Sequence, residues 1–535
     1  MFLVFILFAL LSLSGAAQAE TGVYTQPSAA DMADITPEKA AELNRFYDLR
    51  DYRVAWNLSD DAAMKKTLAF IDSMQALIDY HGLDINAYPF DIMRQLTTSK
   101  SDADKQKLEW MITESLLHLA HDLHGDSTDL EKLYPGWTLH RHSADIPDLL
   151  NTAITDGTLE TFFAQIAPQN PSYSALTKAL QTYRAVAAQG HWPTVPLGPP
   201  LHPQDSDPRV ARLRARLAAE GYVTTSPDGR DDFFDDELNK ALIAYQTRNG
   251  LQPDGHVGPK TLDALNTSVA ARIDQIRANM ERWRHMPEDF PPDRYTLVNI
   301  PAFTVTIVED GKEVYQGDVV DGREDRRTPF VASRIVNMVV NPSWHVPVSI
   351  ARKDILPKLQ KDPHYLETLG IVITGRDEDP SGTTIDWKNT RPDQFNYQLR
   401  QVPGDLNSLG QLKFNFTNPF DVYMHGTPHQ ELFAKPERSF SSGCVRLKDP
   451  VRVGEILLKY NKEGDGWPQQ RIEDEIAAEK THFVTLTKTM PLYFLYWSVF
   501  PDADGQVNFR RDLYGYDSLL IEDMNDRDDQ PSDNQ

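Results

Sequence analysis

The chain has 535 residues, of which 40% are hydrophobic and 25% are charged, a balance typical of soluble globular domains. This length exceeds what one hydrophobic core can organise, so we expect three or four domains. The formal net charge is −24, which disfavours nucleic acid and anionic membrane surfaces as partners.

The N-terminal stretch MFLVFILFALLSLSGAAQAE resembles a secretory signal. Its apolar run is too short to span a bilayer, and Ala-Gln-Ala at 17–19 is a small-residue cleavage pattern, so we predict a signal peptide at 1–19 and export. No Lys or Arg precedes the run, which leaves membrane anchoring by an uncut signal as the alternative. No Cys follows the run, which excludes a lipoprotein anchor.

The pattern from 34 to 195 is helical throughout and predicts an all-α scaffold domain. MKKTLAFIDSMQALIDY has apolar residues at helical spacing, and Ser101 is the predicted N-cap of a second helix that ends at Gly125. That helix carries three histidines, His118, His121 and His124. Steps of three drift around a helix, so we interpret them as a solvated face rather than a metal site. We expect no metal and no cofactor.

A proline-rich linker precedes a compact unit at 205–267, for which we predict three helices with tight turns. This unit resembles the peptidoglycan-binding domain type 1 family. The residues that carry the resemblance are Ala244-Tyr245-Gln246, Gly250-Leu251, Asp254-Gly255, Val257-Gly258, Thr261-Leu262 and Leu265-Asn266. The alternative is a helical spacer without ligand binding.

After residue 291 the period of the pattern changes to two, and we predict a mostly-β domain at 293–517. TLVNIPAFTVTIVEDGKEVYQGDVV alternates and contains a hairpin turn at Asp310-Gly311. A polar, loop-rich insertion at about 349–412 is a candidate substrate lid. Trp344 is an aromatic that could line it and bind substrate. The acidic tail at 521–535 is predicted to be disordered.

Cys444 is the only cysteine, and His425 lies 19 residues before it. An unpaired thiol in an exported protein is a liability unless its chemistry is used, so Cys444 is the candidate nucleophile and His425 its base. An imidazole can lower the pKa of a neighbouring thiol. A buried core cysteine is the alternative, but the small, polar run before Cys444 argues against it. We expect a backbone carbonyl or the hydroxyl of Thr427 to hold the second nitrogen of the imidazole.

Other residues of the same stretch have predicted supporting roles. Ser442 and Gly443 offer backbone N–H groups for an oxyanion hole, and Gly426 lies beside the imidazole. Tyr423 would share a strand face with the imidazole and donate a further hydrogen bond. Arg446 would pair either with a substrate carboxylate or with a structural acid.

The motif resembles the catalytic signature of the L,D-transpeptidase (YkuD) family, in which a His-Gly strand end precedes Ser-x-Gly-Cys-x-Arg-Leu. The matching residues are His425-Gly426-Thr427 and Ser441-Ser442-Gly443-Cys444-Val445-Arg446-Leu447. The order of parts resembles the long periplasmic branch of that family: signal, helical scaffold, peptidoglycan-binding unit and YkuD domain with a lid (capsule) insertion. The implied fold class is multidomain α+β.

The resemblance implies that the cysteine attacks a meso-diaminopimelate carbonyl in a tetrapeptide stem, releases D-Ala, and passes the acyl group from the thioester to another stem as a 3→3 cross-link. It also implies a periplasmic location, acylation by carbapenems, and other cell-wall synthases as partners. The alternatives are water as acceptor in an L,D-carboxypeptidase, or the amine of a lipoprotein. A metallopeptidase using His425 and His429 lacks an HExxH glutamate. A wall-binding protein with a dead catalytic domain would not need Cys444 and His425.

Overall fold

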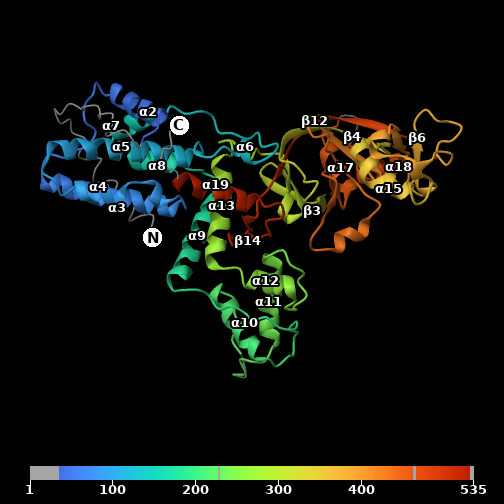
Figure 1. Cartoon of the computed structure of the whole chain (residues 1–535), viewed down its shortest axis with the longest axis horizontal. Helices are drawn as coiled ribbons and strands as arrows, with labels where there is room; N and C mark the ends of the chain where they lie inside the picture. The colour runs from blue at the N-terminus through green and yellow to red at the C-terminus, as the bar shows by residue number, and fades with distance from the viewer. Residues whose placement is uncertain (1–34, 227–228, 462–465, 530–535) are drawn as a thin grey trace. The chain divides into compact units, whose positions relative to one another are not determined.

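The computed structural model describes residues 35–226, 229–461 and 466–529. The chain divides into two compact units, whose helices and strands carry labels in Figure 1. Unit 1 comprises Met1–Leu133, Leu139–Phe290 and Ser498–Gln535, and unit 2 comprises Tyr134–Thr138 and Pro291–Trp497. Within the described ranges, none of the helices has both the length and the apolar character that crossing a bilayer requires.

Unit 1 starts with helices that surround one hydrophobic core, as the apolar spacing predicts. Helix α5 (Asp102–His124) is capped at both ends. The hydroxyl of Ser101 accepts a hydrogen bond from the N–H of Asp104, and Gly125, with φ +91°, ends the helix. The elements are α2 (Pro37–Asp48), α3 (Asp61–Tyr80), η1 (Ile85–Ala87), α4 (Phe90–Leu96), α5 (Asp102–His124), α6 (Leu130–Leu133), α7 (Ile146–Thr155), α8 (Leu159–Ile166) and α9 (Pro171–Ala188).

The histidines of α5 are not the solvated face that we predicted. His121 bridges Glu42 on α2 and Asp126 after α5, at 2.9 Å each, and His124 is buried against Asp126 at 2.9 Å. Burial lowers the pKa of His121, but hydrogen bonds to these two carboxylates overcome it and raise the pKa to about 9. The imidazole is therefore charged and joins α2 to the end of α5. Among the described residues, no group of three or more His, Cys, Asp or Glu could hold a metal ion.

The next helices are α10 (Pro208–Ala219), α11 (Asp236–Arg248) and α12 (Pro259–Leu265), which pack around a small core of their own. The buried amide of Gln246 fixes the turn between α11 and α12. Its Nε2 donates to the carbonyl of His256 at 2.9 Å and to Asp254 at 3.0 Å, and its Oε1 accepts from the N–H of Gly255 at 2.9 Å. The motif residues Gln246 and Asp254-Gly255 therefore build this turn.

Unit 1 is completed by α13 (Val269–Arg284), a hairpin of β13 (Val499–Pro501) and β14 (Val507–Phe509), and α19 (Tyr516–Asp529). Arg282 and Asp517 form a buried ion pair at 2.6 Å between α13 and α19. This corrects two predictions. The catalytic unit ends at Trp497 rather than 517, and residues up to 529 of the predicted disordered tail are helical, because a buried ion pair and the buried Leu520 and Met524 fasten them. Positions 530–535 and the signal at 1–19 lie outside the described residues.

Unit 2 is built on a nine-stranded sheet of order β10-β3-β11-β9-β8-β4-β12-β1-β2, with a further pairing of β3 with β2 (Figure 1). The predicted hairpin turn is present, with positive φ at both Asp310 and Gly311. The strands are β1 (Tyr295–Asn299), β2 (Thr304–Glu309), β3 (Lys312–Gly322), β4 (Val331–Val340), β8 (Leu412–Phe416), β9 (Met424–His425), β10 (Ser439–Ser441), β11 (Val445–Leu447) and β12 (His482–Leu495). Helices α17 (Pro450–Leu458) and α18 (Gln469–Ala477) follow β11. The mostly-strand prediction for this domain is confirmed.

The insertion between β4 and β8 has a hydrophobic core of its own, centred on Trp387 and Phe395. Its three-stranded sheet has the order β5-β7-β6, so the insertion begins at Trp344, before the predicted position 349. Its elements are β5 (Trp344–His345), α14 (Val348–Ile350), a π-helical turn η3 (Ala351–Ile355), α15 (Leu356–Leu359), α16 (Tyr365–Thr368), β6 (Ile371–Ile373) and β7 (Leu399–Gln401). A separate core suits a lid that moves as one body.

Candidate active site

Cys444 lies in a tight loop between β10 and β11, and the residue as a whole is intermediate in exposure. We call residues 441–444 the nucleophile loop. The hydroxyl of Ser441 donates to the carbonyl of Cys444 at 2.5 Å and accepts from the N–H of Gly443 at 3.1 Å. Gly443 has φ +113°, a conformation that side-chain-bearing residues rarely adopt. The glycine before the cysteine is thus required by the turn.

The nucleophile loop is also held by the loop 323–328 that follows β3. The hydroxyl of Thr328 donates to the carbonyl of Gly443 at 3.0 Å and accepts from the N–H of Gly322 at 2.8 Å. The N–H of Arg323 donates to the carbonyl of Ser441 at 3.1 Å. These contacts fix the backbone on both sides of the nucleophile.

His425 lies on β9, the strand next to β11, and its register partner there is Arg446. The ring is buried, and Nδ1 lies 2.5 Å from the carbonyl oxygen of Gly426. A carbonyl only accepts, so we assign the proton to Nδ1, which leaves Nε2 free to accept one. Of the two holders that we considered, the structure uses the carbonyl rather than Thr427. Burial, with the charge of Arg446 adding to it, lowers the pKa of His425 to about 3, so the imidazole is neutral at pH 7.

The thiol of Cys444 is also neutral at rest. Burial raises its pKa, although the N–H of Tyr423 and the charges of Lys413 and Arg446 act in the opposite direction. We expected the imidazole to lower the pKa of this thiol. The difference arises because both groups are largely removed from water, which disfavours their charged forms. The resting site therefore holds a thiol and a neutral base rather than a thiolate and an imidazolium.

Tyr423 lies close to Cys444 and to Trp344 of the insertion. Its ring centroid lies 5.6 Å from that of His425, so the two side chains share a strand face. Trp344 of the insertion lowers the pKa of the Tyr423 hydroxyl and Cys444 raises it, so both side chains lie close to this hydroxyl. Burial is the main cause that raises the pKa of Tyr423, which keeps it a donor. The predicted substrate-binding residue Trp344 thus lies against the tyrosine.

The remaining predicted residues are placed as follows. The N–H of Gly443 is directed to Ser441, so its oxyanion role stays a prediction, as does that of Ser442. The Nε of Arg446 is buried without a hydrogen-bond partner among the described residues, and the choice between a substrate carboxylate and a structural acid as its partner stays a prediction. His429 is exposed beside Glu431, while His425 is buried, so the two histidines do not make a metal pair.

Lys413 is a site residue that the sequence pattern did not reveal. It lies on β8 opposite His425, and its Nζ lies 3.9 Å from the centroid of the Tyr423 ring. Its charge lowers the pKa of the Cys444 thiol. It precedes the nucleophile by 31 positions in a strand of alternating residues, so only the register of the sheet could have identified it.

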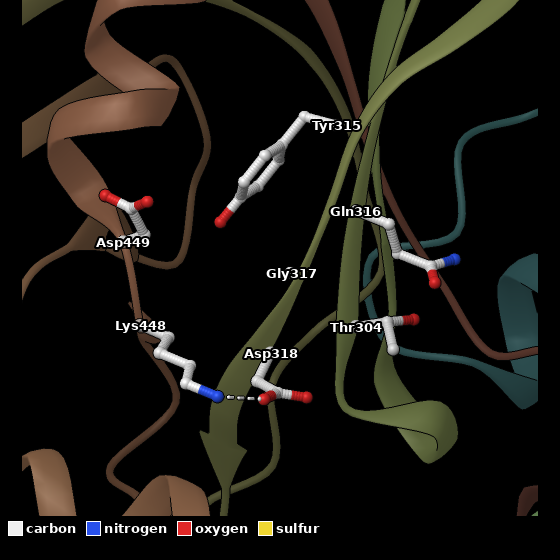
Figure 2. Close-up of a pocket in the computed structure, with 7 residues that line it drawn as sticks. All are labelled: Thr304, Tyr315, Gln316, Gly317, Asp318, Lys448 and Asp449. Carbon is white, nitrogen blue, oxygen red and sulfur yellow. Dashed lines mark hydrogen bonds and ion pairs between the residues drawn. The ribbon is translucent and has the colours of Figure 1, made fainter. Parts of the chain in front are cut away.

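Figure 2 shows a separate depression of about 360 Å³ at the other end of β11. Lys448 binds Asp318 there at 2.8 Å, and the Tyr315 ring extends over Gly317 toward Asp449. Burial, followed by these two carboxylates, raises the pKa of Tyr315 to about 12. The lining residues are Thr304, Tyr315, Gln316, Gly317, Asp318, Lys448 and Asp449. Cys444 does not line this depression, which is distinct from the candidate active site.

Comparison with known proteins assigns three regions of the chain. Residues 293–459 match a family model described as "L,D-transpeptidase catalytic domain" (YkuD). Residues 206–265 match a "Putative peptidoglycan binding domain", and residues 41–180 match a "Scaffold domain".

A curated protein of Haemophilus influenzae, named "Putative L,D-transpeptidase", is 33% identical over 292 residues. The match covers 53% of this chain and 57% of that protein, so the chain spans little more than half the length of this relative. An L,D-transpeptidase structure from Stackebrandtia nassauensis is 15% identical over 57% of this chain and 96% of its own, with a TM-score of 0.21. One from Xylanimonas cellulosilytica is 14% identical over 56% and 99%, with a TM-score of 0.17. Neither TM-score is high enough to support an argument.

Proposed function

Since the chain carries a YkuD L,D-transpeptidase catalytic domain, a peptidoglycan-binding domain and a scaffold domain, we propose that it forms 3→3 cross-links between peptidoglycan stem peptides through a Cys444 thioester. One observation carries the mechanism: His425 is uncharged, with Nδ1 hydrogen-bonded to the carbonyl of Gly426, and it lies on β9, which pairs with the strand that follows Cys444. This is the state that a general base needs before a neutral thiol attacks.

In the acylation half-reaction, the sulfur attacks the carbonyl of the meso-diaminopimelate residue of a donor tetrapeptide while its proton moves to Nε2 of His425. A carbon–sulfur bond forms and the carbonyl becomes a tetrahedral oxyanion. When the oxyanion collapses, the bond to D-Ala breaks and His425 returns the proton to the leaving amine. The product is a thioester on Cys444 and free D-Ala.

In the second half-reaction, the side-chain amine of another stem attacks the thioester carbonyl. His425 accepts a proton from this amine and gives it to the departing sulfur, which restores the thiol. The cations of Lys413 and Arg446 stabilise negative charge as it develops near the sulfur, and we assign Arg446 the further role of binding a substrate carboxylate.

The test is a product assay with disaccharide-tetrapeptides, analysed by mass spectrometry for wild-type protein, Cys444→Ala and an EDTA-treated sample. We expect cross-linked dimers and free D-Ala from the wild type, none from Cys444→Ala, and no effect of EDTA. Tripeptide without dimer would assign the L,D-carboxypeptidase activity instead. Loss of product on chelation would refute the thiol mechanism.

A second acceptor class is the amine of an outer-membrane lipoprotein, and the same assay with such an amine peptide added decides between the two acceptors. We further propose a periplasmic location, with carbapenems as acylating inhibitors and other cell-wall synthases as partners. His425→Ala should not form the carbapenem adduct on Cys444, which intact-protein mass spectrometry detects. A normal adduct in that variant would remove His425 from the role of base.

A further inference from the structure

The guanidinium of Arg326 forms hydrogen bonds to both the nucleophile loop and the insertion. Its Nη1 donates to the hydroxyl of Ser442 at 3.0 Å, two residues before the nucleophile. Its Nη2 donates to Asp354 at 2.9 Å, and Nη1 contacts the second oxygen of the same carboxylate. This is the bidentate arrangement that makes Arg–carboxylate pairs strong and directional.

Asp354 belongs to the π-helical turn η3 of the insertion. Such turns are rare and occur frequently at functional sites. Its neighbours Ala351 and Ile355 belong to the separate hydrophobic core of the insertion, so the backbone of Asp354 is fixed to the insertion. The side chain of Arg326 is 16% exposed and that of Asp354 37%, so the pair is partly shielded from water and its strength is not that of a fully exposed ion pair.

Arg326 itself is anchored in the loop 323–328, which already holds the nucleophile loop through Thr328 and Arg323. Its guanidinium therefore adds a third contact to a segment that must keep its backbone donors in place for a tetrahedral oxyanion. A nearby acid, Asp325, lies 4.0 Å from Nε of Arg326 and is exposed. It approaches Nε, whereas Ser442 and Asp354 are bound through Nη1 and Nη2.

We propose that Arg326 is a positioning residue that couples the position of the insertion to the geometry of the nucleophile loop. With Asp354 in contact, the guanidinium is fixed where it holds Ser442, and the loop is ordered for attack by Cys444. When the insertion withdraws Asp354, Arg326 loses its bidentate partner and Ser442 loses its restraint. The coupling rests on the proposed function only for the role of Cys444 as nucleophile.

The experiment is a double-mutant cycle on the full chain, read by amide hydrogen exchange of peptides that cover 441–444. Asp354→Asn should speed exchange there by roughly tenfold, because Arg326 loses a charged hydrogen-bond partner. In the Arg326→Gln background, where the connection is already cut, Asp354→Asn should change this exchange by less than about twofold. Arg326→Lys keeps the charge without the bidentate geometry and should lie between wild type and Arg326→Gln.

Asp393→Asn is the matched control, because Asp393 forms an exposed ion pair with Arg391 inside the same insertion, at 2.8 Å. It removes the same charge and should leave exchange at 441–444 unchanged. Melting curves identify any variant that fails to fold. A catalytic readout accompanies the cycle: carbapenem acylation of Cys444 in Asp354→Asn should lose roughly tenfold in maximal rate with little change in half-saturating concentration.

Exchange at 441–444 that is unaffected by Asp354→Asn would overturn the coupling. Exchange that rises equally in the wild-type and Arg326→Gln backgrounds would also overturn it, because the signal would then travel by another route. The exchange measurement does not require turnover. Failure of the transpeptidation assay with an intact cycle would therefore count against the proposed function and not against the coupling.

Discussion

Gly410→Ala should displace the backbone at Gly426 and Thr427 and thereby misplace His425. Gly410 has φ +60°, and a Cβ placed on it would lie 2.6 Å from the nitrogen of Thr427 and 2.8 Å from the carbonyl carbon of Gly426. That carbonyl holds Nδ1 of His425. An alanine at this position must therefore displace the peptide group that orients the base.

The magnitude follows from two contributions. An alanine in the left-handed region costs about 1–2 kcal/mol, and overpacking against a backbone adds about 1–3 kcal/mol. The sum is about 2–5 kcal/mol, which lowers the melting temperature of a unit of this size by roughly 4–20 °C. Gly370→Ala is the matched control: its φ is +62°, but the nearest atom, of Val402, is 3.8 Å from the added Cβ. It should lose only the backbone contribution, roughly 2–8 °C.

The assay combines differential scanning calorimetry with carbapenem acylation of Cys444, followed by intact-protein mass spectrometry. Gly410→Ala should slow acylation by roughly tenfold or more, because misplacing a catalytic group by a fraction of an ångström is costly, whereas Gly370→Ala should stay within about twofold of wild type. Equal melting temperatures and equal acylation rates in the two variants would refute the reasoning that the Gly410 contact fixes the base.

Three further predictions concern the charges. In the free protein, the rate of Cys444 alkylation by iodoacetamide should rise about tenfold per pH unit up to pH 9, because only the thiolate reacts and burial raises the thiol pKa. A rate that reaches a plateau below pH 8 would instead indicate a resting thiolate. Lys413→Met should slow this alkylation at pH 8 by roughly threefold to tenfold, and Lys413→Arg should restore most of it; equal rates in Met and Arg variants would exclude a charge effect. Asp517→Asn should cost about 3–5 kcal/mol in urea unfolding of the full chain, because it removes the carboxylate that forms a buried ion pair with Arg282, and a loss below about 1 kcal/mol would show that water reaches the pair.

Helix ends and turns, which depend on neighbouring residues, could be predicted from the sequence. Ser101 and Gly125 bound α5 because capping is a matter of neighbouring backbone groups, and the Asp310-Gly311 turn follows from residues that tolerate positive φ. Cys444 and His425 were proposed as nucleophile and base because their residue types are unusual in this context. A backbone carbonyl was one of two options for holding the imidazole, and the sequence did not identify it as that of Gly426, because it does not say which way the ring turns.

Contacts between distant segments were not readable in this way. Lys413 reaches the site through its register with His425, and Arg326 reaches Ser442 across 116 positions. The tail at 521–535 was predicted to be disordered from its acidity, yet its residues up to 529 continue the helix α19, whose first turn is fastened by the ion pair of Asp517 with Arg282, 235 positions earlier. The pattern of a single sequence does not reveal which buried charges form pairs, because the pairing depends on how distant strands and helices pack in the folded chain.

The uncharged state of Cys444 and His425 affects how readily the thiol is oxidised. Peroxides and disulfides react with thiolates, and a protonated thiol is attacked far more slowly. By keeping Cys444 protonated and His425 uncharged until a substrate carbonyl arrives, the site holds its sulfur in an oxidation-resistant storage form. Burial of the thiol thus slows the reactions by which peroxides and disulfides would consume this unpaired cysteine.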